Sequence, residues 1–170
     1  MLRLWDLKFS AFGVFYGGLG ALFLFTKKAK ESFWAWLDAF TLATLFCLFF
    51  LHLGHFFNGS NYGIPTGLPW GIVFISISIP FTTPLHPTPL YSALLSFFIF
   101  AYGMKRSRQT HLLGVVGSLG IMLYSISAFL IDFLHGAPSL NSKINFLGIA
   151  VLGLVALIHC SHQTYNGENP

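Results

Sequence analysis

The chain has 170 residues, of which 55% are hydrophobic, 18% aromatic and only 8% charged, and its mean hydropathy is +0.71. A soluble domain carries about 25% charged residues, so this composition could not cover a surface that faces water. The formal charge of +4 comes mainly from two short basic clusters. No basic face runs along the chain, which argues against a nucleic-acid partner. We therefore expect an all-α integral membrane protein.

Five apolar segments, taken in chain order, are predicted to cross the membrane as helices of one bundle. They are residues 9–26, 33–57, 90–104, 112–134 and 144–160, within a single membrane domain over 1–170. A spanning helix needs about 20 mainly apolar residues, which leaves the segment 90–104 short. This segment can span if Pro84 to Pro89 forms a rigid lead-in and if Lys105 and Arg106 extend toward the interface.

The basic clusters orient these segments. One cluster follows the first segment at 27–30, and the other follows the third segment at 105–108. Short basic loops stay on the cytoplasmic side, which predicts an external N-terminus, an external loop at 58–89 and an internal C-terminus. No A-x-A-like cleavage site follows the first segment, so we expect a retained helix and not a signal peptide.

The long external loop at 58–89 is polar and punctuated by glycine. Such backbone is tolerated beside a bilayer only where it is buried in protein or lines a wet cavity, so we look for function here. Within the loop, the apolar stretch 68–81 is too short to span. We expect it to be re-entrant or interfacial, with Trp70 as an aromatic anchor at headgroup level.

Ionisable residues inside membrane spans are functional candidates because they are costly in a bilayer. His52 and His55 are three residues apart and share a helix face, which Asn58 continues. Three interpretations fit this face: neutral histidines bonded within a packed bundle, a phosphate or lipid-headgroup site, and a metal site. Zinc needs three or four ligands, and His86 is the only obvious further donor, so no metal site is predicted.

A second polar face lies on the fourth segment. Tyr124, Ala128 and Asp132 are spaced by four residues and line one helix face over about 12 Å. Asp132 falls on the same side of the membrane as the two histidines, where a carboxylate would favour the charged form of an imidazole. Asp38 lies near the opposite end of its helix and is expected to have a structural role.

Two groups of glycines are predicted to allow close helix packing, as small residues do in membrane helices. The groups are Gly17, Gly18 and Gly20 in the first segment and Gly114, Gly117 and Gly120 in the fourth.

The loop motifs resemble those of the prolipoprotein diacylglyceryl transferase family. That family carries G-R-I-G-N-F-I-N-G-E-x-x-G, then L-P-W, then R-H-P-S-Q-L-Y-E. This chain reads L-H-L-G-H-F-F-N-G-S-N-Y-G at 51–63, then L-P-W at 68–70, then L-H-P-T-P-L-Y-S at 85–92. Order and spacing are kept from residue 51 to residue 92.

Two shorter motifs extend the resemblance over nearly the whole chain. The family's H-G-G-L-x-G is similar to the run from Tyr16 to Gly20, and its late Y-x-x-x-R-x-x-x-E is similar to Tyr124, Ala128 and Asp132. The family has seven spans with an external N-terminus. We therefore expect a short or N-terminally truncated member, in which five spans keep the same orientation.

The resemblance implies roles for particular residues. In the family, two arginines bind the lipid phosphate and the first histidine of H-G-G is essential; here these positions hold His52, Ala128 and Tyr16. We expect His52, His55 and Asn58 to hold the phosphate and Tyr16 or His86 to act as the base. The further substrate-binding positions that the resemblance implies are Gly59, Gly63, Tyr124 and Asp132.

The activity implied is transfer of a diacylglyceryl group from phosphatidylglycerol to the lipobox cysteine of a prolipoprotein signal peptide. It would take place in the bacterial cytoplasmic membrane, without a cofactor, on membrane lipid. The missing arginines favour an alternative, a catalytically inactive phospholipid-binding paralogue, because His is charged only in some environments whereas Arg always is. A structural protein of five spans without a ligand is a third interpretation.

Overall fold

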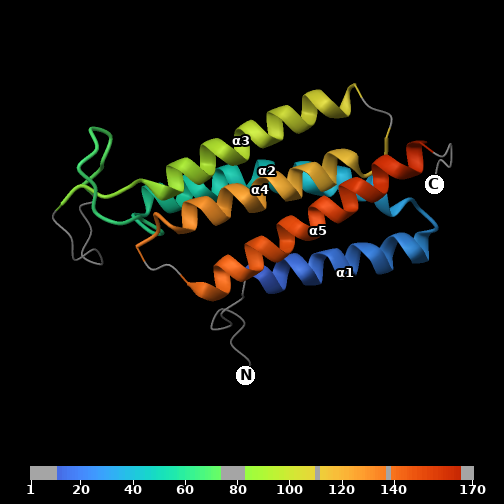
Figure 1. Ribbon diagram of the computed structural model, residues 1–170, viewed down its shortest axis with the longest axis horizontal. Coiled ribbons are helices and arrows are strands. Elements are labelled where there is room, and N and C mark those ends of the chain that lie inside the picture. Colours follow the sequence, from blue (N-terminus) through green and yellow to red (C-terminus); the bar gives the residue numbers. More distant parts are fainter. Residues whose placement is uncertain (1–10, 74–82, 110–111, 137–138, 166–170) are drawn as a thin grey trace.

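The computed structural model describes residues 11–73, 83–109, 112–136 and 139–165, and in these ranges the chain forms an elongated bundle of helices (Figure 1). The helices are α1 (Ala11–Ala29), α2 (Phe33–Phe57), α3 (Thr88–Ser107), α4 (Val115–Asp132) and α5 (Leu140–Tyr165). The described residues contain isolated β-bridges but no strand. The expectation of an all-α fold is confirmed.

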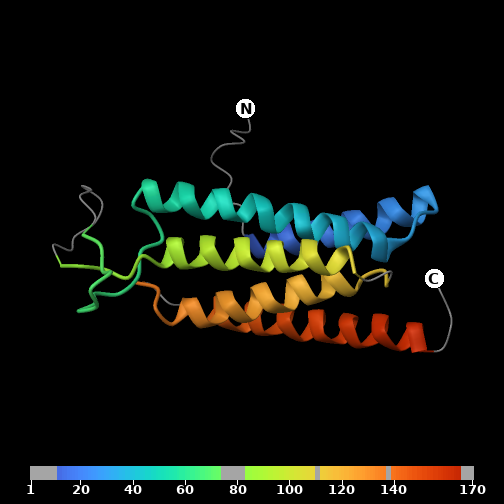
Figure 2. The same cartoon turned by 90° about the horizontal axis from the view of Figure 1, so that it is seen from above.

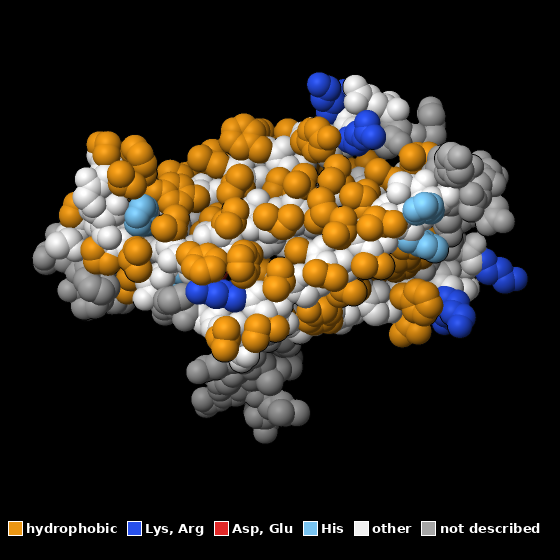
Figure 3. All heavy atoms as spheres, viewed as in Figure 1, with side chains coloured by type: hydrophobic (Ala, Val, Ile, Leu, Met, Phe, Trp, Pro, Cys, Tyr) orange, Lys and Arg blue, Asp and Glu red, His pale blue; other side chains and the backbone are white. Residues whose placement is uncertain are grey.

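Three of the helices within these ranges are long and apolar enough to cross a membrane: Phe33–Phe57, Val115–Asp132 and the Leu140–His162 part of α5. The helices α1 and α3 run alongside them in the same bundle (Figures 1 and 2). Hydrophobic side chains cover most of the face shown in Figure 3, and Phe98 of α3 is 62% exposed. Such a surface suits contact with lipid, and the chain is a helical membrane protein.

The core of the bundle lies around α4, which packs against α2, α3 and α5. The helix α1 lies at its edge and is held mainly by aromatic rings. Phe23 packs edge-on against Phe33 of α2 at 5.9 Å between ring centroids, and Phe12 packs against Phe146 of α5 at 5.2 Å. Because α1 lies at the edge of the bundle, its glycines have fewer neighbouring helices to pack against.

The packing prediction is confirmed for the glycines of α4 and is wrong for two glycines of α1. A Cβ on Gly117 would lie 2.9 Å from the carbonyl oxygen of Leu37, and one on Gly120 would lie 3.0 Å from Thr41, so α2 and α4 approach closely there. Within the described ranges, no neighbouring atom lies within 4 Å of the same position on Gly17 or Gly20. The helix α1 is too peripheral to bring another helix against these residues.

We predict that Gly117→Ala destabilises the bundle by about 1–3 kcal/mol, the usual cost of overpacking, because its Cβ would press against backbone of α2. Gly20→Ala is the matched control, since its Cβ would enter open space. Thermal unfolding in detergent measures both variants. Equal melting temperatures for the two would contradict the close α2–α4 contact.

Asp38 has the structural role expected of it. Its carboxylate accepts hydrogen bonds from the backbone N–H groups of Gly114 (2.8 Å) and Gly117 (2.5 Å). Gly114 has φ +83° and comes directly before the first residue of α4. The first N–H groups of a helix have no partner within it, so a carboxylate from α2 caps α4 and joins the two helices.

At the opposite end of the bundle, the α2–α3 connection folds over the helix ends; we call this the loop end. Gly63 bridges His135, and Leu85 bridges both Pro65 and Ile72. Leu85 is completely buried. Of the stretch 68–81 that was predicted to be re-entrant or interfacial, residues 68–73 are not helical. Trp70 in this part is exposed. The rest of the stretch, 74–81, lies outside the described residues.

Candidate functional site

The two histidines predicted from spacing come together with Tyr124 at the loop end. Because α2 stays helical through Phe57, His52 and His55 project from one face, and their ring centroids are 6.2 Å apart. Nε2 of His52 is hydrogen-bonded to the hydroxyl of Tyr124 at 3.1 Å. This bond joins α2 to α4 and places two imidazoles and a phenol in one polar cluster.

The turn after α2 adds Ser60 to this cluster. Gly59 has φ +64°, a conformation that glycine adopts without steric cost, and the turn brings the Ser60 hydroxyl to 2.9 Å from Nδ1 of His55. The backbone N–H of Ser60 also donates to the carbonyl of His55 at 2.9 Å. Asn58 caps α2 through its backbone N–H, and the residue is exposed.

Asp132 is the last residue of α4 and lies on the Tyr124 face, two turns further toward the loop end. Its Oδ2 is buried and has no hydrogen-bond partner among the described residues. The next residue, Phe133, contacts α5: Nζ of Lys143 lies 4.0 Å from the centroid of its ring. No role was predicted for Lys143, although it is a basic residue directly before the apolar segment 144–160.

Gly63 is the point where the loop meets both α3 and α4. Its N–H donates to the carbonyl of His86 at 2.9 Å, and the next N–H, of Ile64, donates to the carbonyl of Leu134 at 2.9 Å. The hydroxyl of Thr88 donates to the carbonyl of Asn61. Gly63 therefore holds the loop against the helix ends, and its position explains why this site needs a residue without a side chain.

His86 belongs to a second polar group at the start of α3. Trp70 donates its indole N–H to the hydroxyl of Tyr91 at 3.0 Å, and the same hydroxyl lies 3.3 Å from Nδ1 of His86. Trp70 was predicted only as an aromatic anchor and Tyr91 was given no role, although both stand in the motifs at 68–70 and 85–92. The contact between them depends on how the loop folds.

Tyr16 makes its hydrogen bond elsewhere. Its hydroxyl donates to Oδ1 of Asn145 on α5 at 3.4 Å, and the residue is 43% exposed on α1. In the described part of the chain, the structure thus brings together His52, His55 and Tyr124, and it pairs Tyr16 with α5 instead. No group of three or more His, Cys, Asp or Glu side chains in the described ranges is arranged to hold a metal ion.

Comparison with known proteins identifies the family. The family model described as prolipoprotein diacylglyceryl transferase matches residues 1–161. Phosphatidylglycerol–prolipoprotein diacylglyceryl transferases from three bacteria are similar to this chain. The Clostridium tetani protein is 31% identical over 78% of this chain and 54% of its own length. The Polynucleobacter necessarius protein is 31% identical over 91% and 56%, and the Nitratidesulfovibrio vulgaris protein is 33% identical over 79% and 50%.

The chain thus spans about half the length of each of these relatives. The family model nonetheless matches the chain from α1 to α5 and leaves out only the last residues of the final helix. The motifs at the loop end and the polar faces of α2 and α4 lie within the matched residues. The chain belongs to the prolipoprotein diacylglyceryl transferase family.

Proposed function

We propose that this chain transfers a diacylglyceryl group from phosphatidylglycerol to the lipobox cysteine of a prolipoprotein signal peptide. The relatives carry this activity in their names. The observation that supports it most is the cluster of His52, His55 and Tyr124 at one end of the bundle. Such a cluster suits the polar head of a phospholipid whose acyl chains lie against apolar helices.

His52, His55 and Asn58 are the proposed phosphate ligands. Each hydrogen bond to a charged group contributes about 1.5–3 kcal/mol, so replacing two family arginines by His52 and Ala128 removes several such bonds. The imidazoles restore part of this interaction, and the ammonium of Lys143 adds positive charge near the end of α4. The buried Oδ2 of Asp132 is suited to accept a hydrogen bond from a glycerol hydroxyl.

The reaction forms a thioether bond and breaks one carbon–oxygen bond. The cysteine sulfur attacks the glycerol carbon of the diacylglyceryl group, and the bond from this carbon to the phosphate oxygen breaks. The thiol proton goes to a base, and glycerol phosphate leaves with the bonding electrons. A thiolate is the reactive form of cysteine, and donors to the phosphate stabilise the charge of the leaving group.

His86 is the base that we propose first, with Tyr16 as the second candidate. Histidine is the side chain that acts most often as a general base, and His86 lies in the loop at the start of α3, where Tyr91 fixes its ring. Tyr16 is paired with α5, so it would need to leave Asn145 in order to reach a thiol near the loop. Gly59 and Gly63 would shape the backbone around the substrates.

For the orientation, we propose that the loop end faces outward from a bacterial cytoplasmic membrane, with the N-terminus outside and the C-terminus inside. Basic residues stand in the last turns of α1 and α3, away from the loop end. Basic residues beside spans favour the cytoplasmic side. This orientation presents the polar cluster to the outer leaflet, where the lipobox of an exported protein emerges.

We predict that His52→Ala lowers transfer of labelled diacylglyceryl from phosphatidylglycerol by about tenfold or more, since one charge-assisted bond is worth about 1.5–3 kcal/mol. The control is Leu51→Ala, because Leu51 is the neighbouring residue and is 53% exposed on the apolar surface. A folded His52→Ala variant with unchanged transfer would remove His52 from the mechanism.

A non-catalytic phospholipid-binding protein is the second candidate, favoured by Ala128 at a position where the family has arginine. Complementation separates the two candidates. A strain depleted of its own transferase should grow and process lipoproteins if the chain is active. Retained binding of phosphatidylglycerol vesicles, without growth of a strain that expresses the protein well, would support the binding role.

A further inference from the structure

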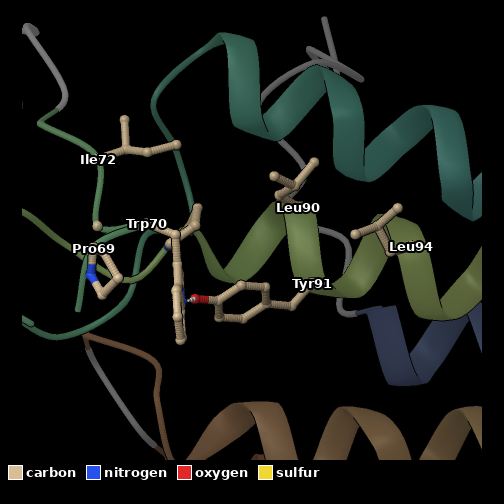
Figure 4. Close-up of a pocket in the computed structure, with 8 residues that line it drawn as sticks. Pro69, Trp70, Ile72, Leu90, Tyr91 and Leu94 are labelled. Atoms are coloured by element: carbon tan, nitrogen blue, oxygen red, sulfur yellow. Dashed lines mark hydrogen bonds between the residues drawn. The ribbon is translucent and has the colours of Figure 1, made fainter.

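A groove beside the loop end is not used by the proposed headgroup site. Its volume is about 600 Å³, and it lies between the loop and the start of α3. Figure 4 shows the side chains that shape it: Pro69, Trp70 and Ile72 from the loop, and Leu90, Tyr91 and Leu94 from α3. Ligand sites typically have about 300–1,000 Å³, so the groove is large enough for several apolar side chains.

One end of the groove is polar. The ring of Tyr91 points from α3 toward Trp70, and the indole N–H donates to the Tyr91 hydroxyl (Figure 4). An indole nitrogen can only donate, so the hydroxyl oxygen is the acceptor, and its own proton is available to Nδ1 of His86 at 3.3 Å. This chain of bonds holds the aromatic wall beside the histidine proposed as the base.

The other end of the groove is continuous with the lipid-facing surface of α3. Leu94 is 44% exposed, and Phe98, one turn further along the helix, is 62% exposed. A molecule that lies in the groove therefore passes from apolar surroundings at Leu94 to hydrogen-bonding groups at Tyr91 and Trp70. This gradient suits a segment that is anchored in the bilayer and becomes polar as it leaves.

We propose that the groove receives the apolar residues that precede the acceptor cysteine of a prolipoprotein, an inference that rests on the proposed function. The backbone of a peptide carries polar groups, which need hydrogen-bond partners when they are buried. The loop backbone and the polar end of the groove would offer such partners. An acyl chain has no polar group to match this end. With the peptide in the groove, its cysteine would lie toward His86.

Photocrosslinking tests the occupant directly. A diazirine amino acid of about the size of leucine replaces Leu94, which lines the groove, in one variant and Phe98 in a matched control, and each is illuminated in phosphatidylglycerol vesicles with a synthetic lipobox peptide. We expect the peptide to be captured at residue 94 and not at 98. Equal capture of the peptide at both positions, or capture of lipid alone at residue 94, would overturn the proposal.

Kinetics give the second readout. Leu94→Trp, which fills the groove, should raise KM for the peptide by about tenfold and leave KM for phosphatidylglycerol unchanged, whereas Phe98→Trp should change neither. A rise in KM for the lipid alone would assign the groove to the lipid and overturn the inference. If the photoreactive variant captures the peptide at residue 94 while the wild-type protein shows no transfer, the proposed function fails and the groove stands. If the wild-type protein shows transfer but the variant does not capture the peptide at residue 94, the proposed function stands and the groove inference fails.

Discussion

Gly63→Ala is expected to displace the loop from the helix ends and to reduce the proposed diacylglyceryl transfer by about tenfold or more, whereas Gly67→Ala leaves both unchanged. A Cβ on Gly63 would lie 2.5 Å from the carbonyl oxygen of Leu134, 2.6 Å from Cβ of His86 and 2.9 Å from Thr88. Among the described residues, no neighbouring atom lies within 4 Å of the corresponding position on Gly67. The two variants change the same loop by the same methyl group.

The size of the effect follows from what surrounds Gly63. Backbone atoms cannot turn away as the end of a flexible side chain can, and overpacking costs about 1–3 kcal/mol, occasionally more. Relief would require the loop to move, which would break the bonds from Gly63 to His86 and from Ile64 to Leu134. His86 would move with the loop, so transfer should fall by more than the loss of folded protein alone would explain.

Two measurements separate these effects. Circular dichroism and thermal unfolding in detergent report whether the helices persist, and labelled-lipid transfer reports the site. We expect Gly63→Ala to keep its helical content while transfer falls, with Gly67→Ala indistinguishable from wild type in both assays. Normal transfer by Gly63→Ala would mean that the loop contacts at this residue do not position the site.

The sequence predicted the helices well where hydropathy and helix boundaries coincide. The helix α2 has the predicted bounds, 33–57. The helix α3 begins at Thr88 and not at 90, because Pro89 is tolerated in a first helical turn and the predicted lead-in is partly helical. The helix α5 begins at Leu140 and not at 144, since the polar residues of its first turn lie outside an apolar window.

The helix packing and the polar contacts between helices were harder to predict from the sequence. The glycines of α1 and α4 look alike in the sequence, yet only α4 lies in the core. Likewise, spacing could place His52 and His55 on one face and Tyr124 on another, but their meeting joins residues 72 positions apart. Which helix residue a loop side chain reaches, as Trp70 reaches Tyr91 of α3, depends on a path without regular structure.

Asp38→Ala is expected to cause the largest loss of stability, because it removes two hydrogen bonds to a carboxylate at once. Bonds to charged groups are worth about 1.5–3 kcal/mol each, and the N–H groups of Gly114 and Gly117 would lose their partner. The control is Glu31→Ala, which removes an exposed carboxylate close to the start of the same helix. Thermal unfolding should show a clear decrease for Asp38→Ala only, and equal melting temperatures would contradict the cap.

The same substitution tests whether the cap also serves the distant site. The helix α4 carries Gly117 at its capped end and Tyr124 and Asp132 toward the loop end, so a shift along its axis changes both ends together. His52 and Tyr124 are 3.1 Å apart, and a hydrogen bond weakens steeply when its geometry is lost. Asp38→Ala protein that is still folded at low temperature should therefore also transfer more slowly. Full transfer by this folded variant would show that the α2–α4 contacts at Gly117 and Gly120 hold the register without the carboxylate.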